Sequence, residues 1–327
     1  MGDAVFCVVG AIVGAGFASG REIMQFFSRW GTFSWPLAAL AGALMGFLIY
    51  RLLRKEGEKG AGIGFRCLAA LVYLAVGGGM TAAAGELWAL TVPLHCARAA
   101  GSLITLALCA CLAAASLKGM AWLGKALLPC MALAFLLCLR VPGQEERGGS
   151  VSLPDGAIAS ALAASYCGMN ALLSAPVLAE MGKKMSAYEK KRAALLSGLT
   201  TGGLLLLANA ALLPHAQRLK DQALPTVALL RDYGKLGYYL SAAVLYLAVM
   251  TTLTAVLRGL NGLLSPFAPH FSPWVSALLT EAVSLAGFQD IVEKAYPALG
   301  FFSLFFLWKN GTKAVDLTFL GERKQNS

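Results

Sequence analysis

The sequence has 327 residues, of which 58% are hydrophobic and 13% are charged, and its formal net charge is +10. That composition is too apolar for a soluble globular protein of this length. Apolar runs of about 20 residues recur from end to end, as expected of a helical protein that crosses a membrane several times. The positive charge does not indicate a nucleic-acid partner, because the basic residues cluster between the apolar runs.

Ten apolar segments follow one another along the chain, with proline or glycine near many of their ends. In order they cover 4–28, 35–53, 64–92, 99–117, 119–139, 155–181, 192–214, 236–262, 273–288 and 290–308. We expect each to be a transmembrane helix of a multi-pass protein of the cell inner (plasma) membrane. Lysine and arginine are dense at 51–66 and 183–192, two connections that share one side, and this predicts that both termini are cytoplasmic.

The first segment, 4–28, is unlike a straight membrane helix. Its sequence GAIVGAGFASGREI, from Gly10 to Ile23, holds four glycines and then Arg21 and Glu22. Glycine disfavours a helix by about 1 kcal/mol relative to alanine, and a charge at membrane depth costs at least about 2.5 kcal/mol. Backbone that leaves a helix within the membrane is tolerated where protein buries it or where it lines a cavity. We therefore predict a broken helix and a binding site at the break.

A second break is expected in segment 155–181, at 166–170, because Gly168 and Asn170 are poor helix formers. Each break would then open a set of five helices, and the two sets would have opposite topology. The predicted division is a first repeat over 1–140, an extracellular loop at 141–153, a second repeat over 154–310 and a cytoplasmic tail at 311–327. Paired interrupted helices indicate a transporter site at the bilayer midplane. The alternative is that these glycines only allow helices to pack closely.

The string GAIVGAGFASGREIMQFF resembles the first-helix signature of the YkvI-like bacterial membrane proteins. The resemblance extends along the chain through the ten segments, the Tyr and Asn of segment 155–181 and the stretch AYPALG at 295–300. That family is placed in the amino acid–polyamine–organocation superfamily. The resemblance therefore implies the leucine-transporter fold, an all-α polytopic membrane protein whose ten helices form two inverted five-helix repeats with helices 1 and 6 broken.

In that fold the two broken helices hold the solute, because unpaired N–H groups at a half-helix start attract a carboxylate. The resemblance implies that the solute-binding residues are Ala15, Gly16, Phe17, Ala18, Ser19, Gly20, Tyr166, Gly168 and Asn170. It also implies a Na⁺ site built from two carbonyls before the first break and from an A-x-x-T-T sequence in segment 236–262, since a hard cation prefers oxygen ligands. The oxygens would come from Gly10, Val13, Ala248, Thr251 and Thr252. The competing interpretation of such threonines is that they bond back to their own helix.

Four further charged residues are candidates for coupling or gating. Lys125 could replace Na⁺ and couple transport to protons, as in some members of the superfamily, or it could extend to the membrane interface. Arg21 could pair with Glu86 and gate the outer vestibule. Glu22 follows the break, where the half-helix dipole favours its charge, and could instead bind a solute ammonium group.

Together these patterns predict a secondary active transporter of a small amino acid or similar solute, coupled to Na⁺, working by alternating access as a symporter. The alternatives are a proton-coupled or uncoupled transporter that uses Lys125, and a regulatory or structural membrane protein. A channel is disfavoured because no repeated filter loop occurs in the sequence. An enzyme, an organic cofactor and an ATP-driven pump are not expected, since the sequence shows no HExxH, no Cys/His metal set and no P-loop. The expected partners are the solute and the lipid bilayer, with no nucleic acid.

Overall fold

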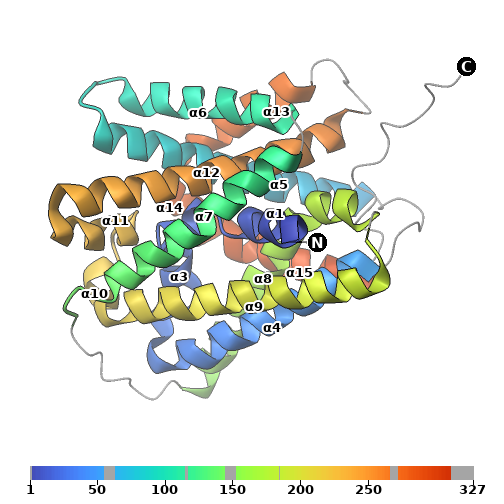
Figure 1. Cartoon of the computed structure of the whole chain (residues 1–327), viewed down its shortest axis with the longest axis horizontal. Helices are drawn as coiled ribbons and strands as arrows, with labels where there is room; N and C mark the ends of the chain where they lie inside the picture. The colour runs from blue at the N-terminus through green and yellow to red at the C-terminus, as the bar shows by residue number, and fades with distance from the viewer. Residues whose placement is uncertain are drawn as a thin grey trace, which may run out of the picture.

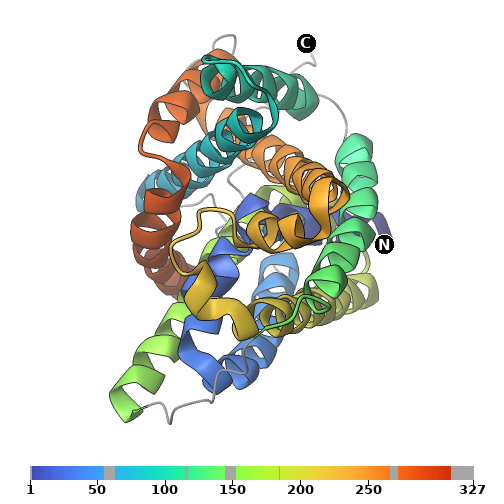
Figure 2. The same cartoon turned by 90° about the vertical axis from the view of Figure 1, so that its left-hand side faces the viewer.

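The protein is described by a computed structural model, which covers residues 2–54, 63–114, 117–143, 152–183, 185–265 and 272–310. Every regular element in these ranges is a helix, and the long helices lie side by side in a bundle (Figures 1 and 2). The long helices are α4 (Ser34–Arg54), α5 (Ile63–Thr91), α6 (Ala97–Ala114), α7 (Leu117–Cys138), α8 (Leu153–Gly182), α9 (Ala187–Leu212), α12 (Gly234–Leu264), α13 (Ser272–Ser284) and α15 (Tyr296–Asn310).

The bundle has the surface of a membrane protein. Six stretches of helix in the described residues are long and apolar enough to cross a bilayer: Ser28–Arg54, Ile63–Thr91, Leu153–Leu178, Ala187–Leu219, Pro225–Leu264 and Phe288–Lys309. Large apolar side chains such as Leu40, Leu278 and Trp274 are exposed on the outside of the bundle. In water such a surface would be unfavourable, whereas lipid chains accept it without cost. The protein is therefore a multi-pass membrane protein in contact with lipid.

Each of the ten predicted segments overlaps a helix, but the number of membrane crossings and the inverted repeats stay predictions. Most of the expected loop at 141–153 and the whole expected tail at 311–327 lie outside the described residues.

Short helical elements join the long helices. They are η2 (Leu213–His215), α10 (Ala216–Leu219), α11 (Pro225–Leu230), η3 (Arg231–Tyr233), α14 (Phe288–Asp290) and the π-helical turn η4 (Ile291–Ala295). Figure 1 shows α10, α11 and α14 near one another at one end of the bundle.

The predicted break in the first segment is confirmed. This segment consists of α1 (Gly2–Ile12), α2 (Ala15–Ala18), α3 (Arg21–Phe26) and the 3₁₀ turn η1 (Ser28–Phe33). Gly14, between α1 and α2, is extended at φ −85° and ψ −170°. Gly20, between α2 and α3, has φ +81°, a conformation that glycine adopts far more readily than other residues. The segment therefore leaves helical geometry twice, and Figure 2 shows its middle part surrounded by other helices.

The predicted break at 166–170 is wrong, because α8 is one helix from Leu153 to Gly182. A Cβ atom at Gly168 would lie 2.7 Å from the carbonyl oxygen of Gly300, so this glycine brings the backbones of α8 and α15 together. The Asn170 amide donates a 3.0 Å hydrogen bond to the carbonyl of Tyr166, one turn earlier in the same helix. Of the two residues that suggested a break, Gly168 thus serves helix packing and Asn170 forms a local hydrogen bond.

Helices α4 and α9 also touch backbone to backbone. A Cβ atom at Gly42 would lie 2.6 Å from the Cα of Gly202, and one at Gly198 would lie 2.8 Å from the Cα of Gly46. Small residues allow this approach, which maximises van der Waals contact where lipid supplies no hydrophobic drive. The α4–α9 pair therefore forms a tight wall beside the broken segment.

Candidate functional site

The broken segment is enclosed by protein. Residues 15–20 are all buried, and the N–H of Ala15 donates to the Met80 sulfur of α5 at 3.3 Å. The Ser19 hydroxyl donates to the Gly16 carbonyl at 3.0 Å and accepts from the Arg21 N–H at 3.2 Å. The side chain expected to contact solute thus bonds within the break and stabilises the start of α3.

Glu22 lies where the sequence predicts a solute carboxylate. Its side chain sits directly against Gly16, so that any side chain at position 16 would collide with the carboxyl group. Glu22 is 3% exposed, and its Oε2 has no hydrogen-bond partner among the described residues. The glycine at position 16 therefore makes room for an acidic side chain of the protein itself.

Two tyrosine hydroxyls accompany this carboxyl group. Tyr166 of α8 and Tyr296 of α15 are fully buried, and within the described part of the chain neither hydroxyl has a hydrogen-bond partner. Glu22 lies within electrostatic range of both hydroxyls. Unpaired buried polar groups are costly and rare. We call these three residues the central polar cluster.

Aromatic and small residues hold the two tyrosines in place. The ring of Tyr166 packs against Phe26 and Phe27, each with its ring centroid 5.4 Å away. A Cβ atom at Gly79 of α5 would lie 3.2 Å from the Tyr296 hydroxyl, so this glycine lets the hydroxyl approach the helix. Sequence reasoning missed Tyr296 as a site residue, although it belongs to the AYPALG stretch that contributed to the family resemblance.

Other residues that were predicted to bind the solute contact neighbouring helices or their own helix instead. Phe17 packs edge-on against Phe135 of α7, with ring centroids 6.0 Å apart. Gly168 faces α15, and the Asn170 amide is bonded within α8, as described above. Of the three residues predicted from segment 155–181, only Tyr166 joins Glu22 at the break.

Arg21 points toward the end of the bundle that carries α10 and α11. Its guanidinium donates to the carbonyls of Lys220 at 2.6 Å and Gln222 at 3.1 Å, and forms an ion pair with Glu293 of η4. The expected pairing with Glu86 is wrong, because Glu86 pairs with Arg98 at 2.7 Å. The partner of Arg21 is instead Glu293, which lies in the π-helical turn η4, a feature that no sequence pattern predicted.

At the same end of the bundle, α11 covers the break. The N–H of Thr226, in α11, donates to the Ser19 carbonyl at 2.8 Å. A polar pocket of about 300 Å³ lies beside this closure and is lined by Arg21, Met24, Gln25, Arg29, Lys220 and Glu293. The Arg21–Glu293 pair and the 219–226 connection therefore separate the break from a pocket that opens at this end.

Some of the residues that the sequence predicts to bind Na⁺ lie close together. The Thr252 hydroxyl donates a 3.5 Å hydrogen bond to the Gly10 carbonyl, and the Cβ position of Gly14 is 2.8 Å from the same hydroxyl. Two oxygens that bind one cation at about 2.4 Å and at right angles lie about 3.4 Å apart, so the spacing of this pair is compatible with a hard cation as well as with the hydrogen bond. The Thr251 hydroxyl donates to the Ala248 carbonyl at 2.9 Å, which is the back-bonding alternative. Val13 is fully buried at the end of α1.

Lys125 lies apart from this group. Its side chain is exposed on α7, with the ammonium nitrogen 5.9 Å from the centre of the Phe6 ring. At the preceding position of α7, the Cα of Gly124 lies 3.4 Å from the Cβ position of Gly10, so Gly10 also serves the packing of α1 against α7.

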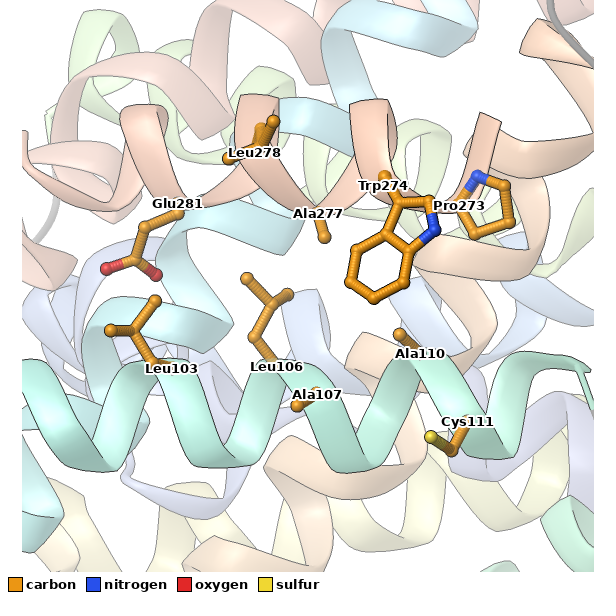
Figure 3. A pocket seen from close by; sticks show the side chains of 10 residues that line it. All are labelled: Leu103, Leu106, Ala107, Ala110, Cys111, Pro273, Trp274, Ala277, Leu278 and Glu281. Carbon is orange, nitrogen blue, oxygen red and sulfur yellow. The ribbon is translucent and has the colours of Figure 1, made fainter. Parts of the chain in front are cut away.

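A second hollow differs in character. A groove of about 460 Å³ runs between α6 and α13, with Leu103, Leu106 and Trp274 in its walls (Figure 3). Glu281 stands at one end of it and accepts a 2.9 Å hydrogen bond from Ser102. Walls of this kind suit hydrocarbon chains, so the groove is a poorer candidate for a polar solute than the break.

Comparison with known proteins agrees with the membrane architecture. No family model matches the sequence. The chain is 25% identical over 327 aligned positions to the uncharacterized protein YyaD of Bacillus subtilis (strain 168), covering 92% of this chain and 93% of that protein. It is 24% identical over 323 positions to the uncharacterized membrane protein YkvI of the same organism, covering 92% of each. The chain is thus similar over most of its length to two bacterial proteins, one of which is named a membrane protein.

Proposed function

We propose that this protein is a secondary active transporter that moves a small amino acid-like solute across the membrane by alternating access. The observation that carries the proposal is the doubly broken first segment, buried at the centre of the bundle next to three polar groups without partners. Irregular backbone and unpaired polar groups inside a membrane bundle are costly, and in transporters they form the binding site. A structural or regulatory role would have no use for either feature.

The similarity to YkvI and the break at Gly14–Gly20 support placing the chain in the amino acid–polyamine–organocation superfamily, with the leucine-transporter fold. The continuous α8 departs from the second broken helix of that fold. The solute site proposed here is therefore built on the first break alone, with Tyr166 and Tyr296 contributed by intact helices.

We propose Na⁺ as the coupling ion, held by the Gly10 carbonyl and the Thr252 hydroxyl, with Val13, Ala248 and Thr251 as further oxygen donors. A bound cation next to the break would link the ion gradient to the solute site. The exposed position of Lys125 favours Na⁺ coupling over proton coupling through that lysine.

Uptake into proteoliposomes tests the proposal. The purified protein is reconstituted, and the accumulation of radiolabelled small amino acids is followed with an inward Na⁺ gradient, with a pH gradient and with neither. We expect saturable accumulation that requires the Na⁺ gradient. Flux that does not saturate and is independent of every gradient would contradict a transporter.

The Arg21–Glu293 ion pair is expected to hold one side of the transporter closed. Arg21→Gln and Glu293→Gln should each lower the thermal stability of the detergent-purified protein, and the double variant should lose less than the sum. We expect a coupling energy above about 1 kcal/mol, because the side chains of Arg21 and Glu293 are 6% and 30% exposed and removing one partner leaves a largely desolvated charge unpaired. A double-mutant cycle from melting curves measures this energy.

The matched control is the Arg218–Asp232 pair, whose atoms are 3.0 Å apart but whose side chains are 53% and 41% exposed. Its coupling should stay below about 1 kcal/mol. Equal coupling energies for the two pairs would argue against a closing role for Arg21 and Glu293.

A further inference from the structure

We propose that the central polar cluster, Glu22 with Tyr166 and Tyr296, binds the primary ammonium group of the solute, so that an amine is required for recognition and a free carboxylate is not. This inference rests on the proposed transport function, because it specifies the chemical class of solute at the same site. The glycine-rich break by itself predicts that the site binds the carboxylate of the solute. In this proposal the protein supplies the carboxylate, and the solute supplies the ammonium group.

The first argument is the chemistry of the unpaired atoms. Glu22 Oε2 and the hydroxyls of Tyr166 and Tyr296 are buried and without hydrogen-bond partners among the residues described. A carboxylate accepts hydrogen bonds, and a phenol hydroxyl can accept or donate. An ammonium group carries three donors and one positive charge, so it offers the donors that these oxygens lack and neutralises the carboxylate.

The second argument is steric and electrostatic. A solute carboxylate bound to the N–H groups of the break would have to approach Gly16, but the Glu22 carboxyl already lies against that residue. Two carboxylates at one buried position repel each other. The site can therefore receive the amine end of a solute far better than its acid end.

The third argument is the placement of the neighbouring positive charge. Arg21 precedes Glu22 in sequence, yet its guanidinium is turned away and is held by the Lys220 and Gln222 carbonyls and by Glu293. Consecutive helical residues point in different directions, so the two charges act at different places. Arg21 closes one end of the bundle, while Glu22 belongs to the central polar cluster.

The test is a thermal-shift titration of the full-length protein in detergent, with and without Na⁺. The probes are matched sets that vary one end of the molecule at a time: alanine, alaninamide, N-acetylalanine and propionate, and the corresponding set for leucine. We expect the free amines to stabilise the protein, the amides to do so at least as well as the free amino acids, and the N-acetyl compounds and plain acids to have no effect.

Glu22→Gln should weaken the apparent affinity for the amines at least about tenfold, because it removes the charge from a charge-assisted hydrogen bond. Glu86→Gln is the control, since Glu86 is partly exposed and forms an ion pair with Arg98. If Glu22→Gln does not yield folded protein, Tyr296→Phe provides the second test. It removes one hydroxyl, keeps the ring, and should weaken amine binding several-fold.

The outcomes separate this inference from the transport function. Three results would each overturn the ammonium site. The first is that N-acetyl compounds bind as well as free amines, and the second is that amine affinity is unchanged in Glu22→Gln and Tyr296→Phe. The third is that Na⁺ alone stabilises the protein and no amine adds to this effect. Gradient-driven uptake of an N-acetylated or purely acidic solute would keep the transporter and refute the ammonium site. Amine binding without accumulation in proteoliposomes would keep the site and refute transport.

Discussion

Replacing Gly198 with alanine is expected to destabilise the folded protein by at least about 1–3 kcal/mol. The added carbon would lie 2.8 Å from the Cα of Gly46 and 2.9 Å from the carbonyl oxygen of Gly42. Both are backbone atoms, which cannot move aside as a flexible side chain can, so α4 and α9 would have to separate. The melting temperature of the purified protein in detergent measures the effect.

Gly203→Ala is the matched control in the same helix. Gly203 is exposed, and nothing lies within 4 Å of its Cβ position. Alanine favours a helix over glycine by about 1 kcal/mol, so this variant should be as stable as the parent or more so. If the Gly198→Ala and Gly203→Ala variants have the same melting temperature, α4 and α9 do not touch as described.

Thr252→Val is expected to raise the Na⁺ concentration needed for half-maximal uptake by about tenfold or more. Valine keeps the shape of threonine but replaces the hydroxyl that lies 3.5 Å from the Gly10 carbonyl. An oxygen that binds an ion contributes about 1.5–3 kcal/mol, which corresponds to roughly ten- to a hundredfold in affinity. Uptake into proteoliposomes as a function of Na⁺ concentration measures the change.

Thr280→Val controls for the loss of a buried hydroxyl. Thr280 is fully buried in α13 and donates to the Ser276 carbonyl of its own helix at 2.7 Å. We expect its Na⁺ dependence to match that of the parent protein. Thr251→Val should have a smaller effect than Thr252→Val, since the Thr251 hydroxyl already bonds to Ala248. Unchanged Na⁺ dependence in Thr252→Val would refute the proposed cation site.

The break in the first segment was predictable because its causes are local. Gly14 and Gly20 weaken the helix at their own positions, and the charges of Arg21 and Glu22 are unfavourable in lipid whatever surrounds them. The resemblance pointed to the same segment. Thr252 could also be placed near Gly10, because the A-x-x-T-T spacing matched a known arrangement.

Segment 155–181 shows where local reasoning fails. Gly168 is as poor a helix former as Gly14, yet it lies within an unbroken helix because Gly300 of α15 packs against it. A glycine that breaks a helix and one that lets another backbone approach have the same local propensity. Only the partner helix distinguishes them, and its contact is remote in sequence.

The partners of Arg21 and Glu22 could not be predicted from the sequence either. Arg21 pairs with Glu293, and Glu22 lies within electrostatic range of two tyrosines from α8 and α15, through the crossing of helices that are far apart in the chain. No periodicity in the sequence encodes which side chains face each other across such crossings.

The sequence by itself therefore determined the membrane setting, the positions of the helices and the broken first segment, since hydropathy and glycine propensity act over a few neighbouring residues. Only the tertiary structure decided that α8 is continuous, that Arg21 pairs with Glu293 and that a carboxyl group occupies the centre of the break. Those features depend on helix packing, in which the space left by one glycine is filled by a residue from another part of the chain.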